Sequence, residues 1–276
     1  MTSKENRALP FERLLLTGAA GALGRVLRGG IKHLASCMRL SDRETIEQPQ
    51  TDEEVVGCDL GDRDAVLALT EGVDAVVHLG GISGENAFDA ILNSNIVGMY
   101  NLYEGCRKNG VSRVVWASSN HAIGFYPRTQ VIDATVPQRP DTNYGLSKAF
   151  GENVAQYYWD KYGIETVSMR IGSCFPKPRD RRMLSTWLSY PDLIQLVERS
   201  LLAPRVEHTI IYGVSNNDMV LWDNTKALHI GYRPKDNAEQ FRAEVEALGP
   251  AQDKDDLFVA VHGGGYASAG HFDDPS

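Results

Sequence analysis

The stretch LLLTGAAGALG, residues 14–24, decides the fold of this chain. It begins as a short apolar run that suits a central strand, and it continues into glycines at positions 18, 21 and 24. Residues 25–34 then have the character of a helix. Glycines in this order allow a tight turn and bring the backbone close to the pyrophosphate of a dinucleotide, which rests on the helix N-terminus. The stretch therefore predicts a dinucleotide-binding unit; the alternative is a glycine-rich turn without a ligand.

The alternation of strand and helix continues along the chain. Further strands are expected at 37–40, 54–58, 75–79, 114–117 and 166–171, with helices at 62–70, 88–109 and 145–162. Such alternation predicts an α/β fold with a Rossmann-type, doubly wound parallel sheet. We expect one NAD(P)-binding domain over 1–276, with a core at 13–171 and a small substrate-binding and C-terminal part at 172–276. That part should hold a helix near 192–202 and a strand near 209–212, and its tail, 263–276, should be mobile or packed against a partner.

The composition excludes several classes of protein. The 276 residues carry 28 Lys and Arg against 36 Asp and Glu, a net charge of −8, which argues against nucleic acid or an acidic membrane surface as a partner. No apolar run approaches the ~20 residues of a membrane span, and the first residues lack the apolar centre of a signal peptide. The four cysteines and seven histidines show no ligand spacing, so no metal is expected. We expect a cytoplasmic protein.

Tyr144 and Lys148 form the second motif. They lie four residues apart at the start of a helix, hence one turn apart on one face. A free phenol titrates near pH ~10, and a nearby ammonium lowers that pKa, so the pair suits removal of a proton from an alcohol. Y-x-x-x-K alone is common by chance. Ser118 and Ser119 add weight to it, because they leave an apolar strand at the edge of the sheet where ligands bind.

Residues at other strand ends suit the rest of a dinucleotide. Asp42 follows the second strand, where a carboxylate accepts hydrogen bonds from an adenosine ribose and repels a 2′-phosphate. NAD is therefore favoured over NADP, although Arg43 could hold that phosphate. Asp59 either reaches the adenine or caps the helix at 62–70. The small residues of the stretch 80–83, GGIS, let a ribose approach the backbone, and His78 before them is expected in the core.

A cationic loop follows the sixth strand. Residues 177–182, KPRDRR, carry four cations and one anion on the ligand edge of the sheet. A guanidinium grips a carboxylate with two hydrogen bonds, and Arg182 directly precedes an apolar pair that should pack inward. We therefore interpret Arg182 as a carboxylate-binding residue, and Lys177 and Arg179 as solvated charges. His121 is interpreted as a hydrogen-bonding residue for the substrate, with local loop packing as the rival.

These motifs together carry a family resemblance. TGAAGALG, HLGGIS, ASSN and YGLSK, in this order between residue 14 and residue 171, resemble the short-chain dehydrogenase/reductase superfamily in its extended, sugar-modifying branch. SSNHAIGFYP (118–127), RIGSC (170–174), RMLSTW (182–187), WDN (222–224) and PKDNAE (234–239) extend the resemblance to the bacterial uronate dehydrogenases within it. The resemblance implies NAD-dependent oxidation of C1 of the uronic acids D-glucuronate or D-galacturonate to an aldarolactone. A homo-oligomer is also expected.

The resemblance also implies roles for single residues. Tyr144 would be the base, Lys148 its partner and a ligand of the nicotinamide ribose, and Ser119 would hydrogen-bond the C1 oxygen. With Ser119 and Tyr144, the substrate-binding residues would be Ser83, Asn120, His121, Ser173 and Arg182. The full cofactor-binding set is expected to be Gly18, Gly21, Ala22, Leu23, Gly24, Asp42, Asp59, Leu60, Leu79, Gly80, Gly81, Ile82 and Lys148.

Other functions could use the same residues. A nucleotide-sugar epimerase or dehydratase needs the Tyr–Lys pair, but it usually has a larger C-terminal domain than residues 172–276 provide. Another NAD-dependent sugar dehydrogenase of the superfamily would differ only in its substrate. A catalytically silent NAD-binding regulator would have no physical need for Ser119, Tyr144 and Lys148 together.

Overall fold

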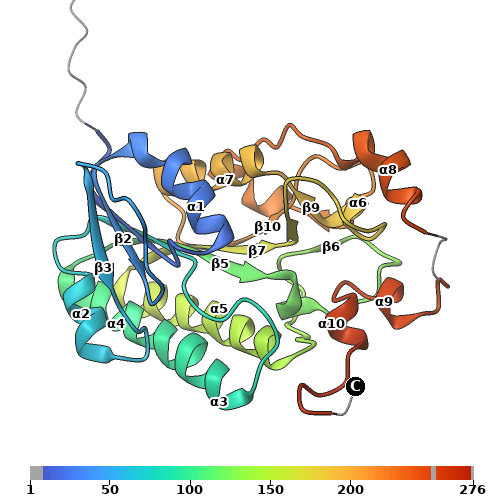
Figure 1. Cartoon of the computed structure of the whole chain (residues 1–276), viewed down its shortest axis with the longest axis horizontal. Coiled ribbons are helices and arrows are strands. Elements are labelled where there is room, and N and C mark those ends of the chain that lie inside the picture. The colour runs from blue at the N-terminus through green and yellow to red at the C-terminus, as the bar shows by residue number, and fades with distance from the viewer. Residues whose placement is uncertain (1–8, 250–252, 275–276) are drawn as a thin grey trace, which may run out of the picture.

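Residues 9–249 and 253–274 are described in a computed structural model of the chain (Figure 1). Their centre is a seven-stranded sheet with the order β10-β7-β5-β4-β1-β2-β3, in which every neighbouring pair is parallel. The expected doubly wound sheet is confirmed. Its strands are β1 (Phe11–Thr17), β2 (Ala35–Asp42), β3 (Glu53–Gly57), β4 (Ala75–His78), β5 (Arg113–Ser119), β7 (Glu165–Ile171) and β10 (His208–Gly213).

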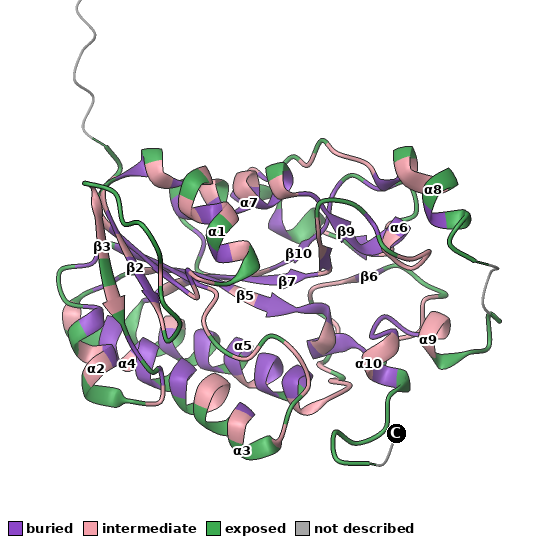
Figure 2. Ribbon diagram, in the orientation of Figure 1, coloured by how far each residue is buried: buried purple, intermediate pink, exposed green. Residues whose placement is uncertain are grey.

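Helices cover both faces of the sheet, as Figure 1 shows. One face carries α1 (Ala22–Gly30) and α7 (Tyr190–Leu202), and the other carries α2 (Arg63–Leu69), α4 (Gly98–Asn109) and α5 (Asn143–Tyr162). Each layer has its own apolar core: Leu27 and Leu193 belong to the first, Tyr103 and Ala155 to the second. Figure 2 shows the buried residues along the strands and on the inward sides of these helices. Because the strand order reverses between β1 and β4, a crevice for ligands is expected at the carboxyl ends of these strands.

The remaining elements are short. The helix expected at 88–109 is interrupted, because α3 (Phe88–Ile91) passes through a π-helical turn (Leu92–Val97) before α4. Two small parallel sheets join β6 (Ile132–Asp133) to β11 (Trp222–Asp223) and β8 (Ser173–Cys174) to β9 (Trp187–Leu188). The other helices are α6 (Met183–Thr186), α8 (Arg242–Glu246), α9 (Leu257–Ala260) and α10 (Gly265–Ser268), with 3-10 turns at Lys32–Leu34, Asn120–Ile123, Thr225–Ile230 and Ala238–Phe241.

Several local expectations can be compared with these elements. His78 is a buried histidine whose Nδ1 lies 2.7 Å from the hydroxyl of Thr17, as expected for a core residue. Asp42 ends β2 rather than following it. Asp62, not Asp59, caps α2, because its side chain accepts the N–H groups of the first turn. None of the helices in the described part of the chain combines the length and the apolar character needed to cross a membrane.

A buried ion pair fixes α5 against the sheet. The guanidinium of Arg170, on β7, donates from Nε and Nη2 to the two carboxylate oxygens of Glu152, on α5, at 2.8 Å each. Both side chains are 1% exposed. Ser118 donates to the same carboxylate at 2.7 Å and Gln138 donates at 3.0 Å, so the Glu152 oxygens are well satisfied. Burial alone raises the pKa of Glu152, but the hydrogen bonds and charge of Arg170 outweigh it and leave that pKa lowered.

We expect Glu152→Gln to cost about 3–5 kcal/mol of unfolding free energy, because it leaves the Arg170 guanidinium buried without its carboxylate. Urea unfolding of the purified protein measures this. Arg242→Met is the control, since it removes an exposed pair with Glu239 and should cost less than about 1 kcal/mol. A double variant, Glu152→Met with Arg170→Met, should lose less than the sum of the single losses. Equal losses for the buried and the exposed substitution would show that the pair does not anchor the helix.

Candidate active site

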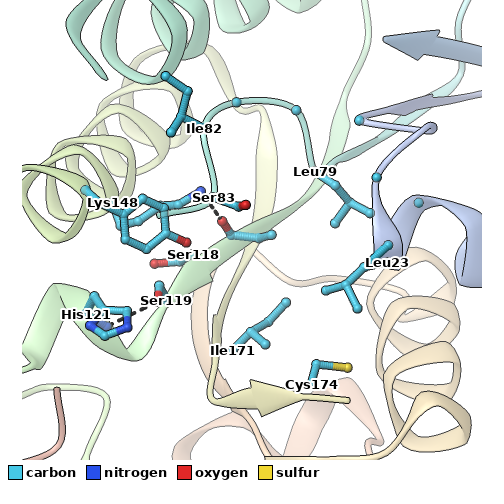
Figure 3. Close-up of a pocket in the computed structure, with 18 of the residues that line it drawn as sticks. Leu23, Leu79, Ile82, Ser83, Ser118, Ser119, His121, Lys148, Ile171 and Cys174 are labelled. Atoms are coloured by element: carbon cyan, nitrogen blue, oxygen red, sulfur yellow. Dashed lines mark hydrogen bonds between the residues drawn. The ribbon is translucent and has the colours of Figure 1, made fainter. Parts of the chain in front are cut away.

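A cavity of about 740 Å³ lies at the carboxyl edge of the sheet. It is lined by every residue that the sequence places in the site, from the glycine loop to the cationic loop. Figure 3 shows Ser119, His121 and Lys148 on one side of the pocket and Leu23, Ile171 and Cys174 on the other. The cavity therefore combines apolar walls with a small number of placed polar groups, as ligand pockets commonly do.

The glycine loop has the shape of a dinucleotide cradle. Gly18 has a φ of +70°, and a Cβ on it would lie 2.7 Å from the backbone of Leu79. A Cβ on Gly24 would overlap the carbonyl oxygen of Gly18. Helix α1 begins after Gly21 with no side-chain cap, so its first N–H groups remain free for a phosphate. These residues fit NAD at the position that the sequence predicts.

Asp42 is held against this loop. Its carboxylate accepts a hydrogen bond from the N–H of Ala20 at 2.9 Å and another from the N–H of Glu44 at 3.1 Å. Arg43 and Glu44 are exposed beside it on the pocket rim. The carboxylate is thus fixed before any ribose binds, with lone pairs left for hydroxyl donors.

We expect kcat/KM for NAD to exceed that for NADP by more than ~10-fold, or ~1.4 kcal/mol, because a 2′-phosphate would meet the Asp42 carboxylate. Asp42→Ser should reduce this ratio, since Arg43 then faces the phosphate without the opposing charge. Arg43→Gln is the control and should lower only the activity with NADP. Equal use of both cofactors by the unmodified protein would contradict the role of Asp42.

The start of α5 is capped from two directions. The N–H of Gly145 donates to the Thr142 hydroxyl at 3.0 Å, which is a local cap. Glu85, from the loop after β4, accepts the N–H groups of Asn143 and Tyr144 at 3.2 and 2.9 Å. Sequence reasoning missed Glu85, because its partners lie about sixty residues away and no local pattern announces them.

Tyr144 and Lys148 lie on the pocket side of this helix, both buried. Lys148 Nζ donates to the carbonyl of Ala117 at 2.7 Å and lies 5.3 Å from the centre of the Tyr144 ring. Burial raises the pKa of Tyr144, while the Ser119 hydroxyl beside it acts in the opposite direction. Burial also lowers the pKa of Lys148, to about 8. The lowered tyrosine pKa expected from the sequence is therefore not seen in the chain alone.

A buried carboxylate sets the orientation of His121. The Nδ1 atom of His121 lies 2.7 Å from Asp141 Oδ2, and the Asp141 side chain is fully enclosed. Because a carboxylate only accepts hydrogen bonds, Nδ1 carries the proton and Nε2 remains for another partner. Three glycines make room for this carboxylate: a Cβ on Gly124 or Gly263 would overlap it, and one on Gly145 would lie 2.9 Å from its Oδ1.

Gly263→Ala should therefore displace Asp141 and, with it, His121. We expect kcat/KM to fall on the order of 100-fold, as for misplacement of a substrate-binding group by about 1 Å, with little change in NAD affinity. Gly29→Ala is the matched control, because nothing lies within 4 Å of a Cβ at that position. Unchanged activity of the Gly263 variant would mean that the enclosed Asp141 carboxylate has no role in the site.

The segment 256–269, here called the C-terminal wall, corrects one expectation. Residues 263–276 are expected from the sequence to be mobile or packed against a partner, but those from 263 to 267 are buried or half-buried at the site, and Gly263, Gly265 and Tyr266 line the cavity. The Tyr266 ring stacks on the His121 ring, with centroids 4.2 Å apart. The sequence signal for this wall is the glycine run 263–265, and such a run is equally typical of a flexible tail.

Arg182, Asn120 and Ser173 meet this wall. Arg182 Nη1 and Asn120 Nδ2 each donate to the carbonyl oxygen of His262 at 3.1 Å, and Arg182 Nη2 lies 3.4 Å from the Ser173 hydroxyl. Burial lowers the pKa of Arg182, and the carboxylates of Asp180 and Asp141 act against that shift. Within the described residues, no carboxylate forms an ion pair with Arg182, and its Nε has no hydrogen-bond partner. Lys177 and Arg179, by contrast, are exposed as expected.

Asn95 is a second residue that sequence reasoning missed. It lies in the π-helical turn before α4, accepts the N–H of Ile82 at 2.8 Å and donates to the Ile82 carbonyl at 2.9 Å. It also donates to the hydroxyl of Ser147, on α5, at 3.1 Å. These three hydrogen bonds hold the loop carrying Ser83 beside α5, and π-helical turns often occur at functional sites.

Residues 14–190 match the NAD dependent epimerase/dehydratase family. The chain belongs to this family. It is 56% identical to uronate dehydrogenase of Pseudomonas putida over 95% of this chain and 98% of that protein. The structure of glucuronic acid dehydrogenase from Chromohalobacter salexigens is 48% identical, covers 96% of this chain and 99% of its own, and superposes with a TM-score of 0.94. A mutant uronate dehydrogenase from Agrobacterium tumefaciens, complexed with NAD, is 46% identical with a TM-score of 0.93 over 96% of this chain and all of its own.

These comparisons confirm three expectations from the sequence. The resemblance to the extended short-chain dehydrogenases is confirmed over most of the chain, and the Rossmann-type fold is shared with proteins of closely similar sequence. The cofactor of the family is NAD, so the chain is an NAD-dependent oxidoreductase that acts on a CH–OH group. The residue roles in this chain remain predictions.

Proposed function

We propose that the chain oxidises C1 of a hexuronic acid, D-glucuronate or D-galacturonate, and releases the aldarolactone. The observation that carries this proposal is Arg182: a half-buried guanidinium in the pocket, with a buried Nε and without a carboxylate partner in the described residues. A cation removed from water is costly unless an anion joins it. A uronate brings such an anion, and a neutral sugar does not. The uronate dehydrogenases named above support the same substrate class.

The residues divide the chemistry among themselves. The hydroxyl groups of Ser119 and Tyr144 hold the C1 hydroxyl, and Tyr144 takes its proton. The ammonium of Lys148 stabilises the phenolate and binds ribose hydroxyls. NAD supplies the hydride acceptor, and its oxidised ring adds a positive charge that favours the phenolate. Because the oxidised carbon belongs to a ring hemiacetal, loss of hydride and proton gives a cyclic ester, which is the lactone.

The other pocket residues hold the sugar in place. Asn120, fixed by the His262 carbonyl, and His121, fixed by Asp141, present hydrogen-bonding groups to the ring hydroxyls. Ser83 and Ser173 add hydroxyl groups on either side. Holding C1 in one orientation against the cofactor contributes a large part of the reduction in the activation free energy of hydride transfer.

The deciding experiment measures NADH formation with glucuronate, galacturonate, glucose, galactose and nucleotide sugars. Stoichiometric NADH from the two uronates, with little from neutral sugars, supports the proposal. Interconversion of a nucleotide sugar without net NADH would identify an epimerase or dehydratase instead. Tight binding of NAD without turnover of any sugar would identify a regulator.

Arg182→Ala should cost roughly 2–5 kcal/mol in transition-state binding of glucuronate, because a charge-assisted contact in a partly dehydrated pocket is lost. The kcat/KM for glucose, which has no carboxylate, should change little. Arg182→Lys should recover part of the loss, since an ammonium lacks the planar fork. Arg179→Ala is the control in the same loop: its guanidinium stacks 3.7 Å from the centre of the Phe175 ring and should affect neither sugar. A parallel fall for both sugars would place Arg182 in support of the fold.

A further inference from the structure

Arg128 joins the C-terminal wall to helix α6, which begins directly after Arg182. It follows Pro127, which forms a bridge with Val261. Its backbone N–H donates to the Ala260 carbonyl at 2.8 Å, and its Nη1 lies 3.4 Å from the Val259 carbonyl. Its Nη2 donates to the hydroxyl of Ser185, on α6, at 2.7 Å. One side chain therefore holds two segments that are distant in sequence.

Ser185 passes this contact on to Arg182. The Ser185 hydroxyl, after accepting from Arg128, donates to the carbonyl oxygen of Arg182 at 2.9 Å. The wall provides a second connection, because the His262 carbonyl accepts from Arg182 Nη1 at 3.1 Å. Arg128 is thus connected to Arg182 by two routes. The first runs through Ser185 to the backbone carbonyl of Arg182, and the second runs through the C-terminal wall, which contacts both guanidinium groups.

Arg128 also adds a charge behind Arg182. Burial, and to a smaller extent the charge of Arg182, lower the pKa of Arg128 to about 10, while Asp180 opposes the shift. Arg128 therefore stays protonated near neutral pH. His262 lies against both arginines with no hydrogen-bond partner for either ring nitrogen among the described residues, and its pKa is lowered to about 3 by burial and by the two guanidinium charges. The imidazole is therefore neutral near pH 7 and adds no charge between the two guanidinium groups.

The carboxylates of Asp180 and Asp141 favour the charged form of Arg182 from a distance, but in the described chain neither forms an ion pair with it. Asp180 uses its Oδ1 to accept the N–H of Met183 at 2.8 Å, and Asp141 pairs with His121. In the described chain, neither Arg128 nor Arg182 has a carboxylate within ion-pairing distance, and each has a buried Nε without a partner. Two like charges in a poorly solvated region repel each other. An anion bound in the pocket against Arg182 offsets that repulsion.

We propose that Arg128 is a specificity-determining, positioning residue for the carboxylate of the substrate: it does not touch the sugar but fixes the place and raises the positive potential of Arg182. This inference rests on the proposed function and deepens it. It separates two roles in uronate recognition, a guanidinium that meets the carboxylate and a second that holds the first in place and adds to its field. A sugar without a carboxylate gains nothing from either.

The test compares glucuronate with its neutral isostere D-glucuronamide on four variants. Arg128→Met keeps an unbranched side chain but removes the charge and the donors. Arg128→Lys keeps the charge, and Ser185→Ala keeps Arg128 but removes the hydroxyl between the two arginines. Arg113→Met is the control for loss of a poorly exposed guanidinium away from the site: Arg113 also has a buried Nε without a partner among the described residues, but it starts β5, at the end away from Ser119. There it pairs with Glu165 and donates to the carbonyls of residues 200, 201 and 203.

For Arg128→Met we expect kcat/KM with glucuronate to fall by about 10-fold or more, chiefly through KM, while kcat/KM with glucuronamide changes less than about 3-fold. Arg128→Lys should restore most of the preference for the charged sugar. Ser185→Ala should lower the preference by a smaller factor. Calorimetry of glucuronate binding to the enzyme with NADH should show the same order of affinities, and NAD binding should be unchanged throughout.

Each alternative outcome has a distinct meaning. An equal fall with both sugars, or an equal effect of Arg113→Met, would overturn the inference and make Arg128 a purely structural residue. Unchanged constants for Arg128→Met would overturn it as well. Failure of the unmodified protein to oxidise or bind glucuronate would instead refute the proposed function, and with it the inference, before any variant is compared.

Discussion

The ion pair between Arg170 and Glu152 is the constraint on which the geometry of the site depends. It joins β7 to α5 where water does not reach, one helical turn beyond Lys148. Sliding α5 along the sheet would break two parallel hydrogen bonds and leave two buried charges unpaired, so the helix has one stable register. The carboxylate also binds Ser118, whose neighbour is Ser119. The positions of Tyr144, Lys148 and Ser119 relative to one another therefore depend on this one ion pair.

The parts of the site that the sequence predicts are those with a local signal. The glycine loop is recognisable because turn, helix N-terminus and close backbone approach all fall within eleven residues, and the Tyr–Lys pair because helical spacing brings its members together. Asp141, Glu85 and Asn95 have no such signal. Each is a single polar residue in a loop or helix, and its role depends on partners that only the folded chain supplies. The expectation of a mobile C-terminal tail is wrong for the same reason. In the sequence alone, a glycine that fits beside a buried carboxylate cannot be distinguished from a glycine of a flexible tail.

The distribution of charge in the pocket differs from that of the whole chain. The protein carries a net charge of −8, yet the substrate flank of the cavity contains Arg182 with Arg128 behind it. An acidic exterior repels anions at long range, so recognition of a carboxylate has to come from short-range, poorly screened contacts inside the pocket. Burial makes those contacts strong. Among the described residues, both guanidinium groups donate to neutral carbonyl and hydroxyl acceptors, so no carboxylate of the chain competes there with that of the substrate.

The contacts of the C-terminal wall have a consequence for the order in which the molecule assembles. The bond from Asn120 to the His262 carbonyl closes a loop of 142 residues, whereas the glycine loop of the cofactor cradle lies between the first strand and the first helix. Closing so long a loop costs entropy before its contacts form, and the end of the wall is exposed at residues 268 and 269, as is typical of segments that open locally. A molecule whose wall has come away keeps its cofactor cradle but loses the acceptor that orients Asn120 and Arg182. We therefore expect sugar recognition to be lost before nucleotide binding under mild heat or denaturant.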